Sequence, residues 1–208
     1  MSPSQLTRAS GWAAALAGAF FILAEVLTPI TLVTNPNSLS QVALTDRFVI
    51  QSMLTFLAAM LLLAGLVGLY ALQAQEAGRL GAIGFPIAFF VTALMLGDFY
   101  ANTFVTPALA IGVPNALDVH NAGVLVFWLP LEFGFLALAW FPFAVATLRA
   151  GVYPRAAAWL LVVGAVVALV PLPYVNVPFD VAVAWLGIAL MRRSASPSPQ
   201  RHLRRVRT

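Results

Sequence analysis

Three carboxylic acids lie inside long apolar stretches of the sequence, where an acidic side chain is unusual. They are Glu25, Asp98 and Glu132. In such surroundings a carboxyl is stable only when it is protonated, paired with a positive group or open to a polar cavity. Every Arg falls in an expected loop, at an interface or in the tail, so the neutral acid is expected. Because a neutral carboxylic acid in an apolar pocket is a general acid, we predict that all three are catalytic.

Helical spacing predicts the neighbours of these acids, because residues three and four positions apart share one face of a helix. Asn102 follows Asp98 by one turn, and aromatic residues stand one turn to either side of Glu132. Aromatic faces can stabilise a carbocation. The side chains predicted to bind substrate are Tyr100, Asn102, His120, Trp128 and Phe135. The alternative is that each acid simply hydrogen-bonds a neighbouring helix and that the aromatic residues pack.

The composition removes several kinds of chemistry. Cysteine is absent, which excludes disulfides, thiolate metal sites, iron–sulfur clusters and thiol nucleophiles. All eleven basic residues are Arg, which excludes Schiff-base chemistry on lysine. Only His120 of the two histidines lies in an apolar stretch, without a second histidine for haem or a Glu-x-x-His pair for a metal. We therefore expect no cofactor and no metal.

The elements that hold these residues are expected to be membrane-spanning helices. The chain is 62% hydrophobic and 9% charged, whereas soluble domains are about half apolar and a quarter charged. A helix needs about 20 apolar residues to cross a bilayer. The apolar runs cover residues 11–33, 48–73, 81–112, 120–147, 155–172 and 177–191. We predict an all-α, polytopic transmembrane bundle of about six spans.

Two of these runs depart from a simple span. The third is too long, so its end from Phe104 to Pro114 is expected to bend along the outer interface. The last is crowded at its start by three prolines and is barely long enough. We predict one transmembrane domain over residues 1–192 and a disordered basic cytoplasmic tail over residues 193–208.

The arginines predict the orientation. With the N-terminus in the cytoplasm, Arg47 alone lies outside, which is a strong positive-inside signal. The arginines then inside are Arg8, Arg79, Arg149, Arg155, Arg192, Arg193, Arg201, Arg204, Arg205 and Arg207. The outer loops are expected to carry Asp46, Asp118 and Asp180. We predict a multi-pass protein of the cell inner (cytoplasmic) membrane with both termini in the cytoplasm.

The expected partners follow from this placement. The net charge of +4 comes from loops and the tail and not from a folded basic module, so we expect no nucleic acid partner. The lipid bilayer and a small lipophilic substrate are the expected partners. The sequence does not predict a protein partner.

Two stretches carry a resemblance to known proteins, GLVGLYALQAQEAGRLGAIGF (65–85) and LRAGVYPRAAAWLLVVGA (148–165). They resemble small polytopic membrane proteins of high-GC bacteria to which no activity is assigned, and this resemblance implies a multi-span topology. In size, in multi-span character and in lacking the aspartate motifs of soluble cyclases, the chain also resembles the small membrane-bound terpene cyclases of meroterpenoid and indole-terpenoid pathways. That resemblance implies isomerase or lyase chemistry without a redox step, started when embedded Asp or Glu residues protonate an alkene or epoxide.

The leading hypothesis is therefore an integral membrane enzyme that cyclises a prenylated, lipid-like substrate. Asp98 or Glu132 would donate the proton, and another acid or His120 would take the final one. A proton-coupled exporter of a small lipophilic or cationic compound is the main alternative, because the same acids could carry protons. A non-catalytic membrane subunit, with the acids bound to another membrane protein, is the third.

Overall fold

The computed structural model describes the backbone of residues 3–28, 39–117, 125–170 and 174–195. Side chains are described over 5–28, 39–117, 134–170 and 174–193. Within these ranges the structure is helical and contains no strand, which confirms the all-α prediction. The elements are α1 (Pro3–Leu27), α3 (Leu39–Val42), α4 (Asp46–Gln73), α5 (Gly78–Tyr100), the π-helix η2 (Ala101–Val105), α6 (Thr106–Gly112), the 3-10 helix η3 (Pro114–Ala116), α7 (Leu125–Ala150), α8 (Arg155–Val167) and α9 (Val177–Ala195).

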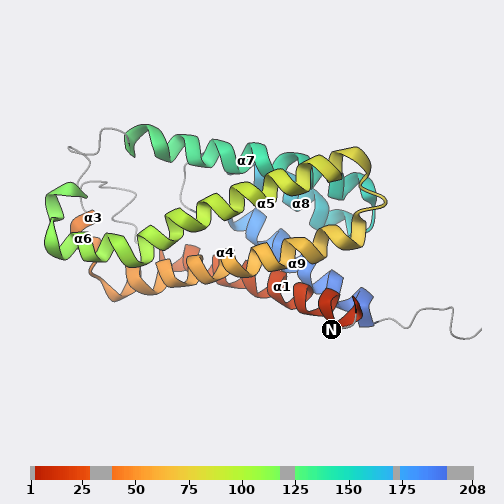
Figure 1. The fold of residues 1–208 in the computed structure, drawn as a ribbon, viewed down its shortest axis with the longest axis horizontal. Helices are drawn as coiled ribbons and strands as arrows, with labels where there is room; N and C mark the ends of the chain where they lie inside the picture. The colour runs from red at the N-terminus through yellow and green to blue at the C-terminus, as the bar shows by residue number, and fades with distance from the viewer. Residues whose placement is uncertain (1–2, 29–38, 118–124, 171–173, 196–208) are drawn as a thin grey trace, which may run out of the picture.

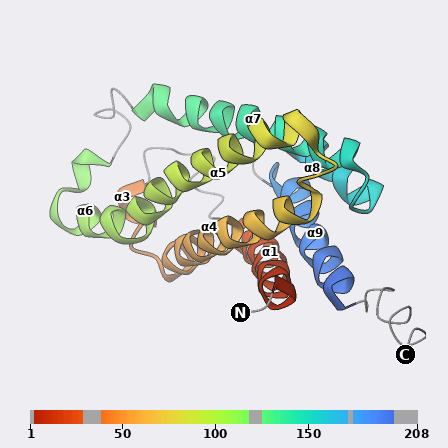
Figure 2. The ribbon, with the colours of Figure 1, turned by 45° about the vertical axis from the view of Figure 1, so that its right-hand side comes forward.

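The six longest described helices form a closed ring. α1, α4, α5, α7, α8 and α9 each contact the next along the chain, and α1 packs against α9 to close the ring. In Figures 1 and 2, α5, α7 and α8 lie on one side of the bundle, and α1, α4 and α9 on the other. Gly11 near the start of α1 faces Met191 near the end of α9, so these two helices are antiparallel. The start of the first helix and the end of the last therefore share one end of the bundle.

Local sequence sets most of the helix boundaries. The Thr45 hydroxyl accepts a hydrogen bond from the Phe48 amide (3.3 Å) and caps α4, which covers the predicted run 48–73 closely. α1 ends at Leu27, short of the predicted residue 33. The residue before a proline avoids the α conformation, so Pro29 explains the stop at Thr28. α7 is described from Leu125 onward, and the predicted start of its run at residue 120 lies outside the described residues.

The long third run bends as predicted, and the π-helix marks where. α5 passes through η2 into α6, and α6 turns away from the α5 axis to contact α3 (Figure 1). Thr103, inside the π-helix, donates a hydrogen bond to the Ser52 carbonyl of α4 at 3.0 Å. This bond fixes the wider turn against the neighbouring helix.

Small residues let the helices approach closely. A Cβ atom on Gly18 would lie 2.6 Å from the Ala184 amide nitrogen, and one on Gly65 would lie 2.7 Å from the Ala14 nitrogen. Such contacts are typical of helix pairs in membranes, where close backbone packing replaces the hydrophobic effect. α1 therefore lies in contact with both α4 and α9 at backbone distance.

Buried aromatic residues and a few internal hydrogen bonds fill the other half of the bundle. The Trp140 ring of α7 packs edge to face on Phe143 and Phe179, at centroid distances of 5.6 and 4.8 Å. Its indole NH donates to the Thr92 hydroxyl of α5 at 3.1 Å. These contacts tie α5, α7 and α9 together.

The outer surface is apolar. Ile83, Phe90, Leu94 and Leu138 each expose more than half of their surface, and many other large apolar side chains do the same. A surface of this kind suits a lipid solvent and not water. Within the described residues, three helices are long and apolar enough to cross a membrane: Gln5–Leu27, Asp46–Gln73 and Gly78–Gly112. Shorter apolar helices cover Gly134–Ala150 and Arg155–Val167.

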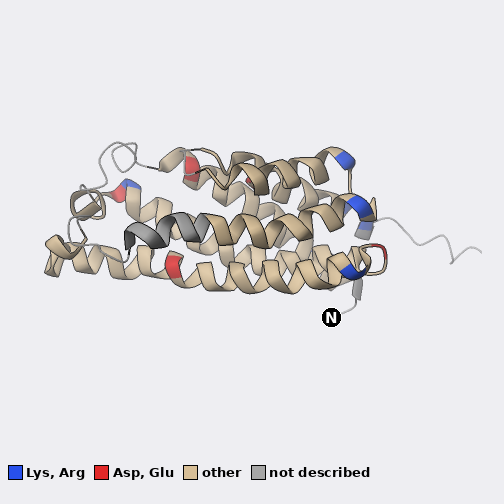
Figure 3. Ribbon diagram, turned by 90° about the horizontal axis from the view of Figure 1, so that it is seen from above, with Lys and Arg blue, Asp and Glu red and all other residues tan. Residues whose placement is uncertain are grey.

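The described arginines divide between the two ends of the bundle. Figure 3 shows most of the basic residues gathered at one end. These are Arg8, Arg79, Arg149, Arg155, Arg192 and Arg193, at the start of α1, the α4–α5 turn, the α7–α8 turn and the end of α9. Arg47 lies at the opposite end, beside the last residues of α1. The basic tail that we predict over residues 193–208 lies outside the described residues from 196 onward, and α9 continues to Ala195.

Candidate functional site

Glu25 forms a polar contact between the first and last helices. Its Oε1 accepts a hydrogen bond from Asn176 Nδ2 at 3.1 Å, although 151 positions separate the two residues. Side chains tilt toward the N-terminus of their own helix. Because α1 and α9 are antiparallel, Glu25 and the polar residues at the start of α9 lean toward each other. The ring closure described above therefore creates this contact.

Asp180 is the second acid at this contact, and its expected place in an outer loop is wrong. It lies in the first turn of α9, only 3% exposed, with Gly18 of α1 against its backbone carbonyl. Its carboxyl lies within electrostatic range of Glu25. The prediction failed because the prolines near the start of α9 indicate a loop. Gly18, which has no side chain, lets the backbone of α9 pack directly against α1, and this contact buries Asp180.

Two oxygen atoms at this contact have no hydrogen-bond partner. They are Asp180 Oδ2 and Asn176 Oδ1, and both are buried. A buried polar atom left without a partner is costly, and native proteins keep few of them. Buried carboxyl groups of this kind are candidates for proton transfer. Glu25, Asn176 and Asp180 are here called the α1–α9 acid site, and its two carboxyls are the groups that could carry a proton.

Strained backbone stands directly before this site. Tyr174 has a φ of 63°, in the left-handed region that a bulky side chain seldom adopts. Its carbonyl accepts a hydrogen bond from the Val177 amide (3.3 Å), and the Asn176 carbonyl accepts one from the Asp180 amide (3.0 Å). This turn places the Asn176 side chain toward α1. Strain of this kind costs about 1–3 kcal/mol and is concentrated at functional sites.

Arg47 lies nearer to Glu25 than the sequence led us to expect. Its guanidinium donates to the carbonyls of Leu27 (2.8 Å) and Val26 (3.0 Å), the last residues of α1. A positive charge at a helix C-terminus complements the helix dipole. Arg47 therefore stabilises the end of the helix that carries Glu25, less than one turn away.

Asp98 belongs to a second polar group. Asn102 Nδ2 donates to Asp98 Oδ2 at 2.9 Å, and Thr106 Oγ1 lies 3.5 Å from Asn102 Oδ1. The prediction that Asp98 and Asn102 share one helix face is confirmed, and Thr106 continues the row. The row runs along the π-helix, an irregularity that is frequent at functional sites.

An aromatic contact lies between the two polar groups. Phe21, one turn before Glu25, packs edge to face on Phe99, next to Asp98, with the ring centroids 6.5 Å apart. From the basic end of the bundle, Glu25 is about 26 Å along α1 from Arg8, and Asp98 about 28 Å along α5 from Arg79. The two acids thus lie at similar heights.

The other predicted site residues are placed as follows. Tyr100 is 52% exposed and contacts Phe56 and Phe104, and Phe135 is 53% exposed on α7. Both rings thus reach the outer surface. The side chains of Glu132, Trp128 and His120 lie outside the described part of the structure. Their predicted roles stay predictions.

The acid site has few of the ligands that a metal requires. Among the described residues, no group of three or more His, Cys, Asp or Glu side chains lies close enough together to hold a metal ion. The α1–α9 acid site contributes two carboxyls and one amide.

Comparison with known proteins gives no further guide to this site. No protein family model, no curated protein and no solved structure matches the chain.

Proposed function

We propose that the chain is a multi-pass protein of the cell inner (cytoplasmic) membrane, with six spans and both ends in the cytoplasm. The closed antiparallel ring, the apolar outer surface and the gathering of arginines at one end support this orientation. The acid site then lies toward the outer side of the membrane. The basic end faces the cytoplasm.

Within this membrane frame we propose an enzyme that starts the cyclisation of a prenylated, lipid-like substrate by proton transfer. The observation that carries the proposal is the α1–α9 acid site, where the buried Asp180 Oδ2 has no hydrogen-bond partner and the half-buried Glu25 accepts a hydrogen bond from Asn176. A carboxylic acid in apolar surroundings can act as a proton donor. Phe21 and Phe99 offer aromatic faces nearby for the cation that follows.

The proposed reaction conserves atoms and electrons. The acid site gives its proton to an alkene or epoxide, and the electron pair of that group forms the new bond to hydrogen. A second alkene attacks the resulting cation and closes the ring. A carbon next to the new cation then loses a proton to Asp98 or Glu132, and exchange with water restores both acids. The product is an isomer of the substrate.

The test measures product formation and deuterium uptake from heavy water. Membranes containing the protein are incubated in heavy water with prenylated aromatic and epoxide substrates, and the products are separated and weighed. We expect an isomer of the substrate. Protonation of an alkene leaves deuterium at one carbon, whereas protonation of an epoxide places it on a hydroxyl, where it exchanges with solvent. Asp180→Asn, Glu25→Gln, Asp98→Asn and Glu132→Gln should each lower formation of the isomer, by roughly 100-fold or more where the acid acts directly. Glu76→Gln is the matched control, because Glu76 is exposed at the opposite end of the bundle. Parent-like rates in all four acid variants would refute the enzyme proposal.

A second candidate function is proton-coupled transport. It is favoured by the π-helix beside Asp98, because interrupted helices line the cavities of transporters. The close contact of α1 with α9 would then be the surface on which the bundle opens. Uptake of a labelled lipophilic cation into proteoliposomes, abolished when the proton gradient is collapsed, would favour this function over the enzyme.

A further inference from the structure

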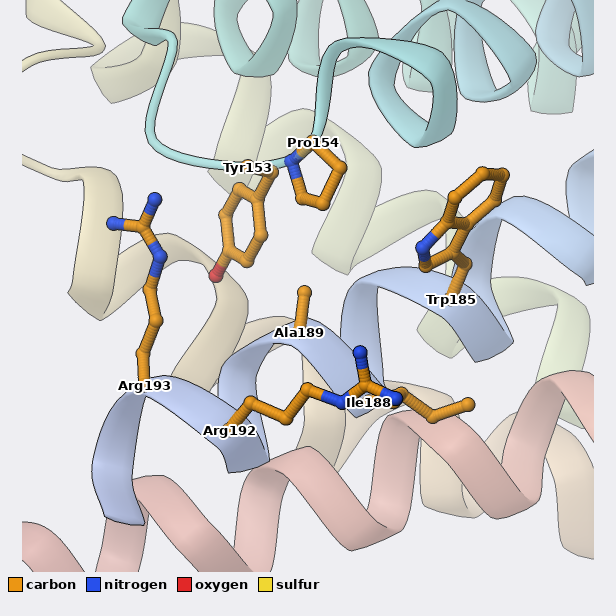
Figure 4. A pocket seen from close by; sticks show the side chains of 7 residues that line it. All are labelled: Tyr153, Pro154, Trp185, Ile188, Ala189, Arg192 and Arg193. Atoms are coloured by element: carbon orange, nitrogen blue, oxygen red, sulfur yellow. The ribbon is translucent and has the colours of Figure 1, made fainter. Parts of the chain in front are cut away.

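A pocket unrelated to the acid site opens at the basic end of the bundle. It has a volume of about 310 Å³ and lies between the α7–α8 turn and the C-terminal half of α9 (Figure 4). Its lining residues are Tyr153, Pro154, Trp185, Ile188, Ala189, Arg192 and Arg193. Ligand sites range from roughly 300 to 1,000 Å³, so this one has room for a headgroup but not for a whole lipid.

The walls of the pocket are held in place by the fold. The Tyr153 hydroxyl donates to the Leu69 carbonyl of α4 at 2.9 Å. Its proton is therefore not available to a ligand, and the ring forms one wall of the pocket. Gly151, with a φ of 63°, ends α7 in the left-handed conformation and allows the sharp turn toward Pro154. On α9 the lining residues follow one helix face, and the small Ala189 side chain leaves the space open.

The charged groups of the pocket come from α9. In Figure 4, Arg193 stands beside Tyr153, while Arg192 extends along the helix toward Ile188. A guanidinium binds phosphate through parallel hydrogen bonds, and Arg suits such sites better than Lys. Trp185 is 42% exposed at the rim, as is usual for indoles at the level of lipid headgroups.

We propose that this pocket binds a phosphate group, as presented by an anionic phospholipid headgroup at the cytoplasmic surface. The proposal rests on the proposed membrane orientation and is independent of the acid site. Basic pockets between spanning helices on this side of the membrane are suited to anionic headgroups. The bound phosphate would be held by the guanidinium groups of α9, with the α7–α8 turn as the opposite wall.

Binding is tested with the purified full chain in a nonionic detergent. Phosphatidylglycerol, phosphatidylcholine and inorganic phosphate are titrated separately, and bound lipid is counted by native mass spectrometry alongside thermal stability. We expect phosphatidylglycerol to bind and stabilise the parent, and Arg192→Gln with Arg193→Gln to weaken binding by roughly tenfold or more. Equal stabilisation by inorganic phosphate would support a phosphate site that is served by the free ion.

Two further variants distinguish binding in this pocket from nonspecific attraction of the lipid to basic residues. Arg79→Gln with Arg149→Gln removes the same charge at the same end from residues that do not line the pocket, and should leave binding within about twofold. Ala189→Leu fills the pocket without changing charge and should abolish binding. If the control pair weakens binding as much as the α9 pair, or if Ala189→Leu binds like the parent, the pocket proposal is wrong. Activity of the acid-site variants has no bearing on this result.

Discussion

Replacement of Gly18 by alanine should push α1 and α9 apart, because the added methyl group meets backbone atoms. The Cβ would lie 2.6 Å from the Ala184 amide nitrogen and against the Asp180 carbonyl. Ordinary contacts begin near 3.4 Å, so the 2.6 Å distance is about 0.8 Å too short. Backbone cannot rotate away as a side chain can, and the helices themselves have to move. Gly97 of α5 is the matched control, since a Cβ there meets nothing within 4 Å.

The two substitutions should change stability in opposite directions. Alanine is a better helix former than glycine by about 1 kcal/mol, and Gly97→Ala should gain up to that amount. At Gly18 the same gain is opposed by overpacking, which costs about 1–3 kcal/mol, and by lost dispersion contacts along the α1–α9 contact. We expect Gly18→Ala to be less stable than Gly97→Ala by about 1–3 kcal/mol.

The assay is unfolding in mixed detergent micelles with increasing SDS, followed by tryptophan fluorescence. Gly18→Ala should unfold at lower SDS than the parent, and Gly97→Ala at the same or higher SDS. The Gly18→Ala variant should also lose the proposed cyclase activity, because the displacement of α1 from α9 separates Glu25 from Asn176. A Gly18→Ala protein as stable and as active as Gly97→Ala would refute the argument that backbone contact at Gly18 sets the acid site.

Three further predictions concern buried hydrogen bonds. Thr92→Val leaves the Trp140 indole without its acceptor and should lower the free energy of unfolding by about 1–3 kcal/mol in the same SDS titration. Thr92→Ser keeps the acceptor and should lower it clearly less. Equal losses of stability in the two variants would show that packing, and not the hydrogen bond, is responsible. Asn176→Ala removes the donor to Glu25 and should lower the free energy of unfolding by about 1–3 kcal/mol. Adding Glu25→Leu removes the acceptor as well and should recover part of that loss. No recovery in the double variant would show that this hydrogen bond contributes nothing to stability. Tyr153→Phe should cost about 1 kcal/mol at neutral pH. Burial raises the pKa of the Tyr153 phenol well above its usual range. Its contribution to stability is therefore complete below about pH 10 and is lost at higher pH, so the difference in unfolding free energy between parent and variant should shrink there. A constant difference up to about pH 12 would contradict this.

The elements of the fold were largely predictable, because apolar runs and their flanking signals define helices by themselves. The apolar run 48–73 predicted α4, and the length of the third run predicted the bend near residue 104. The end of α1 was missed by several residues, although Pro29 was visible in the sequence as a signal for it. Helix pairing was not predictable in the same way, since it depends on which small residues face one another.

The acid site shows the same limit. The position of Glu25 in an apolar run marked it as unusual, and the row from Asp98 to Asn102 followed from helical spacing. Asp180 could not be recognised, because its burial depends on Gly18, which is 162 positions away in sequence. One signal was available: Asn176 and Asp180 are four residues apart at a helix start, opposite a helix rich in Gly and Ala. That pattern indicates a close contact but does not name the partner helix.

The pairing of α1 with α9 also sets an order of events during synthesis. Glu25 is synthesised well before its hydrogen-bond donor Asn176, which follows 151 residues later. Until Asn176 has been made, the Glu25 carboxyl lacks this donor, and the ring of helices stays open between α1 and α9. α9 therefore both closes the ring and completes the acid site, so a chain truncated before residue 174 would leave Glu25 without this hydrogen bond.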